Sequence, residues 1–119
     1  MGAAEATGLP RLSLRVDLGP DHRLGPGKVR LLEGIAAHGS IAAAGRALGM
    51  SYRRAWCLVE AMNAGFGRPV VEAQVGGRAG GGARLSPFGA EVVAQYRAAE
   101  AAASAAAAPF LARLVDLGD

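Results

Sequence analysis

Residues 40–63 carry a hydrophobic pattern with the period of an α-helix. The second half has apolar positions spaced i, i+3, i+4 and i+7, which predicts a helix with one buried face: Ala55, Leu58, Val59 and Met62. Ser51 is a suitable N-cap for this helix, and Ser40 for a shorter one before it. Because Gly49 can adopt a left-handed conformation, we predict two helices joined by a tight turn.

The opposite face of the second predicted helix combines positive charge with aromatic rings. At about 100° per residue, this outer face holds Arg53, Trp56, Cys57 and Glu60. Arg54 lies to one side of it, and Tyr52 lies on the first turn. Guanidinium groups and rings at the N-terminal end of an exposed helix are typical of a helix that reads the major groove of DNA.

The chain before residue 40 predicts a strand and a helix. Residues 11–18 alternate apolar and polar side chains, which indicates a half-buried strand. Residues 19–21 read as a turn, and 25–27 as a loop. Residues 28–38 then follow a helical period that ends at Gly39. Their buried face is predicted to contain Val29, Leu32, Ile35 and Ala36, with Leu31 beside it.

The chain after residue 63 predicts a hairpin and a long helix. Residues 70–75 and 83–85 read as two strands joined by the glycine-rich tip 76–82. Ser86-Pro87 is a strong helix start, and a stripe follows it: Phe88, Val92, Tyr96 and Ala99. We expect this helix to reach about residue 108, Pro109 to kink or end it, and residues 110–117 to form a short last helix.

The resulting order is strand, three helices, β-hairpin and long helix, which is an α+β winged helix-turn-helix. We predict a disordered N-terminal tail over residues 1–10 and the winged helix-turn-helix over 11–86. Residues 87–119 would form a dimerisation helix and tail. The expected dimer contacts on that helix are Val92, Tyr96, Ala99, Ala103 and Phe110.

Charge points to a polyanionic partner. The net charge is +3, but residues 40–86 hold six arginines against two glutamates. A local arginine excess on a presumed binding unit favours nucleic acid. Residues 1–10 do not resemble a signal peptide, and the alanine tract 98–108 is too short and too weakly apolar for a membrane span. We therefore expect a cytoplasmic protein with no membrane partner.

Enzymatic chemistry is not predicted. The lone Cys57 and the separated His22 and His38 offer no metal cluster and no nucleophile–base pair, so we expect no metal and no cofactor. The glycine-rich stretch 76–82 lacks the lysine and the helix context of a nucleotide P-loop. It reads better as the tip of a hairpin wing, with Arg78 and Arg84 supplying charge.

The sequence resembles the N-terminal DNA-binding domain of the ModE family of molybdate-responsive transcriptional regulators, within the LysR-type winged-helix group. The markers are Ser51-Tyr52-Arg53-Arg54-Ala55-Trp56, then Glu60-Ala61-Met62-Asn63, the glycine-rich wing, and Leu85-Ser86-Pro87-Phe88-Gly89. The resemblance covers roughly residues 12–108. It implies a homodimer that binds a palindromic double-stranded operator near molybdenum-related genes. Family members also carry C-terminal molybdate-binding domains, which we do not expect in this chain, so molybdate is not expected to bind it.

The candidate DNA-binding residues are Ser40, Ser51, Tyr52, Arg53, Arg54, Trp56, Arg78 and Arg84. Arg53 would reach base edges and Arg54 a phosphate, whereas Ser51 either caps the helix or also binds a phosphate. Trp56 either contacts a thymine methyl group or folds back as the rim of the core. The alternative function is a winged-helix protein-interaction or dimerisation module that does not touch DNA.

Overall fold

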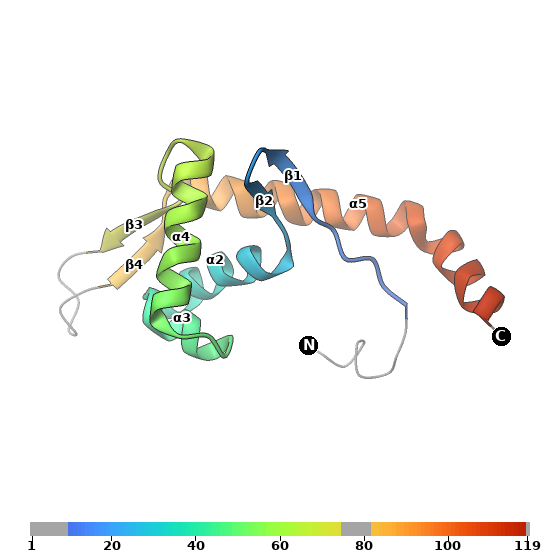
Figure 1. Ribbon diagram of the computed structural model, residues 1–119, viewed down its shortest axis with the longest axis horizontal. Helices are drawn as coiled ribbons and strands as arrows, with labels where there is room; N and C mark the ends of the chain where they lie inside the picture. Colours follow the sequence, from blue (N-terminus) through green and yellow to red (C-terminus); the bar gives the residue numbers. More distant parts are fainter. Residues whose placement is uncertain (1–9, 75–81, 119) are drawn as a thin grey trace.

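The computed structural model describes residues 10–74 and 82–118. Over these residues the chain is α+β, with four helices and two antiparallel sheets of two strands each (Figure 1). Residues 1–9 and 75–81 lie outside the described residues, and they include most of the predicted tail 1–10 and of the predicted hairpin tip 76–82. In chain order the elements are β1 (Val16–Gly19), β2 (His22–Leu24), α2 (Pro26–His38), α3 (Ile41–Ala47), α4 (Tyr52–Phe66), β3 (Val71–Gln74), β4 (Gly82–Leu85) and α5 (Pro87–Gly118).

The elements form a compact body from which half of one helix projects. Helices α2, α3 and α4 gather at one end together with the β3–β4 hairpin, and α5 runs behind them and far beyond (Figure 1). The described chain therefore measures 55 × 30 × 21 Å.

Serine caps and left-handed glycines set the helix boundaries, as predicted. The Oγ atoms of Ser40, Ser51 and Ser86 accept hydrogen bonds from backbone N–H groups three residues ahead, at 3.0, 3.1 and 2.9 Å. Each bond satisfies one of the backbone donors that the first turn of a helix leaves free. Gly39 and Gly49 have φ angles of 78° and 74°, so the chain reverses there at little steric cost.

Helix α2 holds the core together because it contributes to two hydrophobic clusters. Val29 and Leu32 belong to a cluster with α5 and the end of α4, whereas Leu31 and Ile35 belong to one with α3 and the start of α4. All four side chains are fully buried. The prediction for this helix was wrong in two details: Ala36 is exposed, and the helix begins at Pro26 rather than residue 28.

The N-terminal strand is shorter than predicted and has a partner that the pattern did not indicate. β1 begins at Val16 and pairs with β2, with Val16 opposite Leu24 and Asp17 opposite Arg23. The side chains of residues 11–15 alternate between exposed and half-buried, as in a strand, but these residues pair with no other strand in the described part of the chain. The pattern assigned no element to residues 22–24, because a three-residue strand is too short to show a period of two.

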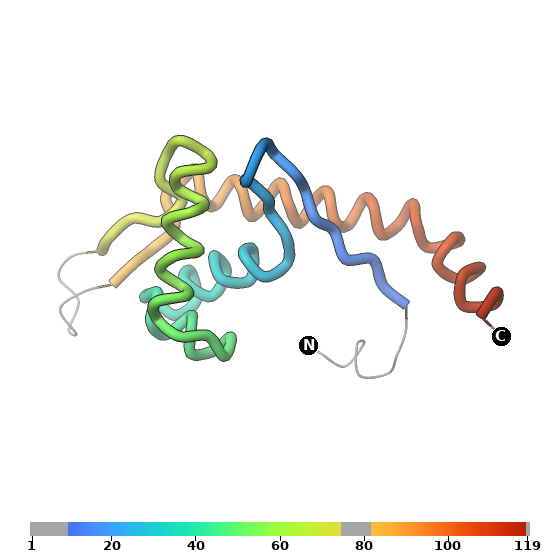
Figure 2. The backbone as a smooth tube through the Cα atoms, viewed as in Figure 1, coloured from blue at the N-terminus to red at the C-terminus, as the bar shows by residue number. Residues whose placement is uncertain are grey.

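Of the two outcomes predicted at Pro109, a kink or an end, the end is wrong, and so is the separate short helix predicted over residues 110–117. α5 is a single helix of 32 residues with Pro109 inside it. Proline removes one backbone donor, but the alanine-rich turns before it are the best helix formers. The tube in Figure 2 changes direction over its last turns, which agrees with a kink. Among the described helices, α5 alone is long and apolar enough to cross a membrane, a weak criterion that helices of soluble proteins also meet.

Candidate nucleic-acid interface

The first two turns of α4 present four large side chains to solvent. Tyr52 and Trp56 are 57% and 45% exposed, and Arg53 and Arg54 are exposed beside them. Neither guanidinium forms an ion pair with another described residue. We call these four residues the arginine face. The two guanidinium groups are therefore available to a partner, and Trp56 keeps nearly half of its surface exposed.

The buried side of α4 fixes the direction in which the arginine face points. Ala55, Val59 and Met62 are buried, as the spacing predicted, and Leu58 is half-buried. Helix α3 approaches closely because it has Gly45 at the contact, where an added Cβ would lie 3.2 Å from the Cβ of Ala55. α3 and α4 therefore form a tightly packed pair, and α4 cannot rotate about its axis without losing this contact.

Hydrogen bonds from two backbone N–H groups hold the β3–β4 hairpin beside this helix pair. The N–H of Ala83 donates to the carbonyl of Gly39 at 2.8 Å, which joins β4 to the α2–α3 junction. At the other strand, the N–H of Val70 donates to Oδ1 of Asn63 at 2.8 Å, which joins the start of β3 to α4. The base of the hairpin is therefore attached to the helix pair at two points.

The remaining candidates from the hairpin and α3 are less free. Arg84 is exposed but pairs with Glu72 across the hairpin at 3.4 Å. Ser40 is half-buried, and its hydroxyl is occupied as a cap. It lines a hollow of about 280 Å³ with Tyr52, next to Gly82. Arg78 lies outside the described residues.

Basic residues near the N-terminus, which sequence reasoning did not assign to the site, also come close to α4. Arg15, Arg23 and Lys28 line a hollow of about 490 Å³ together with Arg54. We call this hollow, with its four basic side chains, the basic hollow. The alternation of residues 11–18 placed Arg15 on the polar face, but nothing in the pattern indicated the β1–β2 pairing that brings Arg23 beside it.

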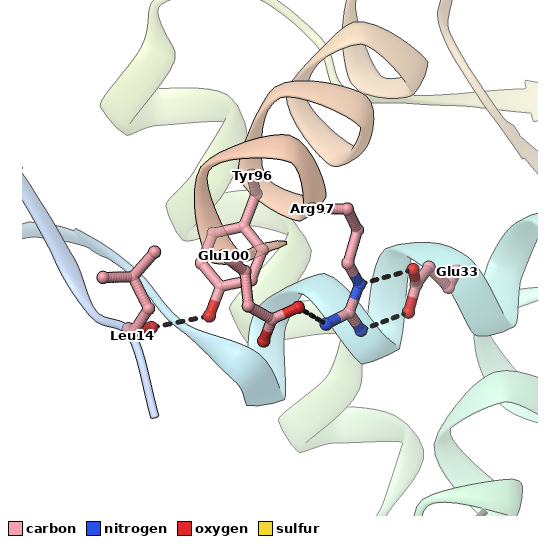
Figure 3. Close-up of polar contacts among 5 residues, drawn as sticks. All are labelled: Leu14, Glu33, Tyr96, Arg97 and Glu100. Carbon is pink, nitrogen blue, oxygen red and sulfur yellow. Dashed lines mark hydrogen bonds and ion pairs between the residues drawn. The ribbon is translucent and has the colours of Figure 1, made fainter. Parts of the chain in front are cut away.

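The first half of α5 is attached to the core by polar contacts (Figure 3). The hydroxyl of Tyr96 donates to the carbonyl of Leu14 at 2.6 Å. Arg97 donates to both carboxylate oxygens of Glu33 on α2, at 2.9 and 2.7 Å, and to Glu100 at 2.7 Å. The hydrogen bond from Arg97 lowers the pKa of the Glu33 carboxyl, and the two carboxylates raise the pKa of Arg97.

Two of the five predicted dimer contacts lie inside the chain's own core. Val92 and Tyr96 are 8% and 3% exposed, because β1, β2 and α2 cover this side of α5. Ala99 borders an apolar groove next to them, Ala103 is half-buried, and Phe110 is 70% exposed. Of the five, Ala99, Ala103 and Phe110 therefore keep exposed or half-exposed side chains, whereas Val92 and Tyr96 only line the groove.

The described residues contain no group of three or more His, Cys, Asp or Glu side chains that could hold a metal ion. His22 packs edge-on against Phe66 with the ring centroids 4.4 Å apart, and its ring occupies the space where Gly65 lacks a side chain. His38 and Cys57 are exposed. His22 lies in β2 and His38 is the last residue of α2, so the two histidines come from different elements.

Several known proteins are similar to part of this chain. The molybdenum-pterin-binding protein MopB of Rhodobacter capsulatus is 51% identical over 79 residues, which are 66% of this chain and 29% of MopB. The molybdenum transport protein ModE of Azotobacter vinelandii is 41% identical over 92 residues, 77% of this chain and 33% of that protein. The DNA-binding transcriptional dual regulator ModE of Escherichia coli K12 is 37% identical over 71 residues, 60% of this chain and 27% of the regulator.

The chain spans about a third of the length of these relatives. Their names describe regulators, transport proteins and pterin-binding proteins rather than enzymes. No protein-family model matches the chain. The chain is homologous to the ModE and Mop proteins over roughly its N-terminal two thirds, which is consistent with the N-terminal domain of the ModE family.

Proposed function

We propose that this chain is a sequence-specific DNA-binding transcriptional regulator with a winged helix-turn-helix. In this proposal α3 and α4 are the helix-turn-helix, α4 is the recognition helix, and the β3–β4 hairpin is the wing. The observation that carries it is the arginine face, where two guanidinium groups without ion pairs to described residues stand on the exposed first turn of a tightly packed helix. A rigid helix with free arginines at its N-terminal end suits the major groove.

The four side chains of the arginine face take different roles. Arg53 lies at the centre of the exposed turn and would donate two hydrogen bonds to the edge of a guanine, the commonest specific contact. Arg54 and the hydroxyl of Tyr52 would bind phosphates on either side, and Trp56 would contact a thymine methyl group. On the hairpin, Arg84 would exchange Glu72 for a phosphate, and Arg78 is assigned to the wing tip by prediction only.

We further propose a homodimer that uses α5. The groove next to Ala99 has a volume of about 540 Å³ and a lining that is almost entirely apolar, including Leu18 and Phe88. The distal part of α5 exposes Phe110, Leu114 and Leu117 by 70%, 61% and 73%. One chain leaves both surfaces uncovered, and a second copy would cover them. Two-fold symmetry would then require a palindromic operator with half-sites one helical turn, or a multiple, apart.

The relatives suggest where such a regulator would act. Because the similar proteins are named for molybdenum transport and molybdenum-pterin binding, we propose target genes for molybdenum uptake or use. A DNA partner would place the protein in the cytoplasm. That molybdate does not bind this chain stays a prediction, as does the absence of a cofactor.

Selection from a pool of random duplexes, followed by sequencing of the bound fraction, tests this function directly. We expect two inverted half-sites to be enriched, and affinity to fall as salt rises, because phosphate contacts release counterions. Arg53→Ala should reduce the preference for the selected sequence over random DNA. Arg30→Ala, which removes an exposed arginine from the side of α2 opposite Lys28, is the matched control and should change neither property.

The contrary outcome has a clear meaning. If no duplex is enriched and binding to DNA is undetectable at low salt, the DNA-binding proposal fails. The protein-interaction module would then be the better description. If Arg53→Ala loses equal affinity for selected and random DNA, Arg53 binds a phosphate and does not contact base edges.

A further inference from the structure

The basic hollow lies on one flank of α4, and the hairpin lies on the other. Tyr52 and Arg54 are two residues apart, so their side chains leave the helix about 200° apart. Tyr52 faces the hollow beside Gly82 at the base of the hairpin. Arg54 faces the basic hollow, whose other charged walls come from the segment before β1, from β2 and from the start of α2. Arg53 stands between these two surfaces.

The basic hollow holds more positive charge than its own carboxylate neutralises. Asp17 is the acid that pairs with its arginines: it lies 3.2 Å from Arg15 and 3.7 Å from Arg23. Arg54 and Lys28 form no ion pair with described residues, and Nζ of Lys28 donates to the carbonyl of Arg23 at 2.8 Å. The four basic side chains of the hollow therefore carry four positive charges, and the one carboxylate that pairs with two of them leaves an excess of three.

We propose that the basic hollow binds the phosphodiester backbone of the duplex, on the strand that faces away from the hairpin. This inference rests on the proposed function. A helix in the major groove lies between two phosphate backbones, and the hairpin can reach only the one on its own side. The other backbone would then pass over Arg54, Arg15 and Arg23. Lys28 adds charge there, and its hydrogen bond holds it close to β2.

Phosphate contacts of this kind are independent of sequence, which separates them from the role of Arg53. A phosphate would compete with Asp17 for both arginines, so Asp17 should weaken binding in the wild-type protein. The proposed DNA-binding surface of the protein therefore includes Arg15 from the segment before β1 and Arg23 from β2, both outside the helix-turn-helix.

The test is the salt dependence of duplex binding for the double variant Arg15→Gln/Arg23→Gln, measured by fluorescence anisotropy. Each lost phosphate contact should reduce the slope of log affinity against log salt by about 0.9, so the double variant should lose about 1.8. The loss should be the same on a selected operator and on random duplex. Asp17→Asn should bind both duplexes more tightly than wild type. Arg30→Gln, on the side of α2 opposite Lys28, should leave the slope unchanged, and thermal unfolding should confirm that each variant is folded.

The outcomes separate this inference from the function on which it rests. If wild type binds duplex with a clear salt dependence and the folded double variant keeps the full slope, the basic hollow does not bind DNA and the inference is overturned alone. If the loss occurs only on the selected operator, the contact is base-specific and the inference is likewise overturned. If wild type does not bind duplex at any salt concentration, the proposed function and this inference fail together.

Discussion

The backbone N–H of Ala83 donates to the carbonyl of Gly39 at 2.8 Å, and this bond places the hairpin against the α2–α3 junction. The approach needs the glycine before Ala83, because a Cβ on Gly82 would lie 2.8 Å from the same carbonyl oxygen. The orientation of the hairpin relative to α4 therefore depends on a residue without a side chain.

Gly82→Ala should destabilise the fold by about 1 to 3 kcal/mol, the usual cost of overpacking a close contact. The backbone of Gly39 cannot move away without breaking the hydrogen bond to Ala83. Chemical unfolding of the variant measures the loss. Gly27→Ala is the control: an added Cβ meets nothing within 4 Å in the first turn of α2, so stability should be unchanged or slightly higher. Equal stability of the two variants would contradict the close contact.

The ion pair between Arg97 and Glu33 should make stability depend on acid pH. The folded-state pKa of Glu33 lies below its ordinary value of 4.5, so the stabilisation is fully present above about pH 4.5 and is lost as the pH falls through the lower folded-state value. Both side chains are over a third exposed, so the contribution is about 0.5 to 1 kcal/mol. Glu33→Gln should flatten this part of the stability curve, whereas Glu91→Gln, an exposed glutamate that bonds Gln95, should keep it.

Tyr96 should make stability fall at alkaline pH. Burial raises the pKa of its hydroxyl above the ordinary value of 10.0, with a further contribution from Glu100. Above about pH 10 the unfolded chain loses this proton before the folded chain does, so stability decreases. Tyr96→Phe should remove that decrease and cost about 0.5 to 1.5 kcal/mol at neutral pH, because the carbonyl of Leu14 loses its donor. In a Tyr52→Phe background, phenolate absorbance follows Tyr96 alone, and ionisation at the ordinary pKa would contradict the burial.

Ser51 allows its two candidate roles to be separated. Its Oγ caps α4 by accepting from Arg54 N–H at 3.1 Å. Ser51→Ala should cost about 1 kcal/mol, the usual cost of losing an N-cap. Ser51→Asp keeps a cap, so its stability should match wild type, but its carboxylate would repel a DNA phosphate and duplex affinity should fall. If Ser51→Asp binds duplex as tightly as wild type, the start of α4 does not face the phosphate backbone.

The distal part of α5 should control the oligomeric state. Phe110 and Leu114 are four residues apart and share one exposed face. Phe110→Glu/Leu114→Glu should convert a dimer to a monomer in sedimentation experiments. Ala112→Glu is the control, because residue 112 leaves the helix on the opposite side. A monomeric wild type, or a dimer that survives the double substitution, would contradict dimerisation through this face.

The sequence by itself determined the local features of this protein. The three serine caps, the left-handed Gly39 and Gly49, and the buried face of α4 all follow from short-range spacing and backbone sterics, and the structure confirms them. The exposed turn that bears Arg53 and Arg54 follows from the same helical period. The ModE resemblance was likewise visible in short motifs, and the similarity to ModE and Mop proteins over 71 to 92 residues agrees with it.

Only the tertiary structure decided which distant residues meet. The β1–β2 pairing brings Arg23 beside Arg15, and the position of the start of α2 places Lys28 in the same hollow. No local sequence pattern links these three positions. Likewise, an apolar stripe does not reveal what covers it, and so the pattern alone could not show that Tyr96 would be buried under Leu14 within the same chain. Local spacing sets the conformation of each segment, whereas the contacts between segments depend on how all of them pack at once.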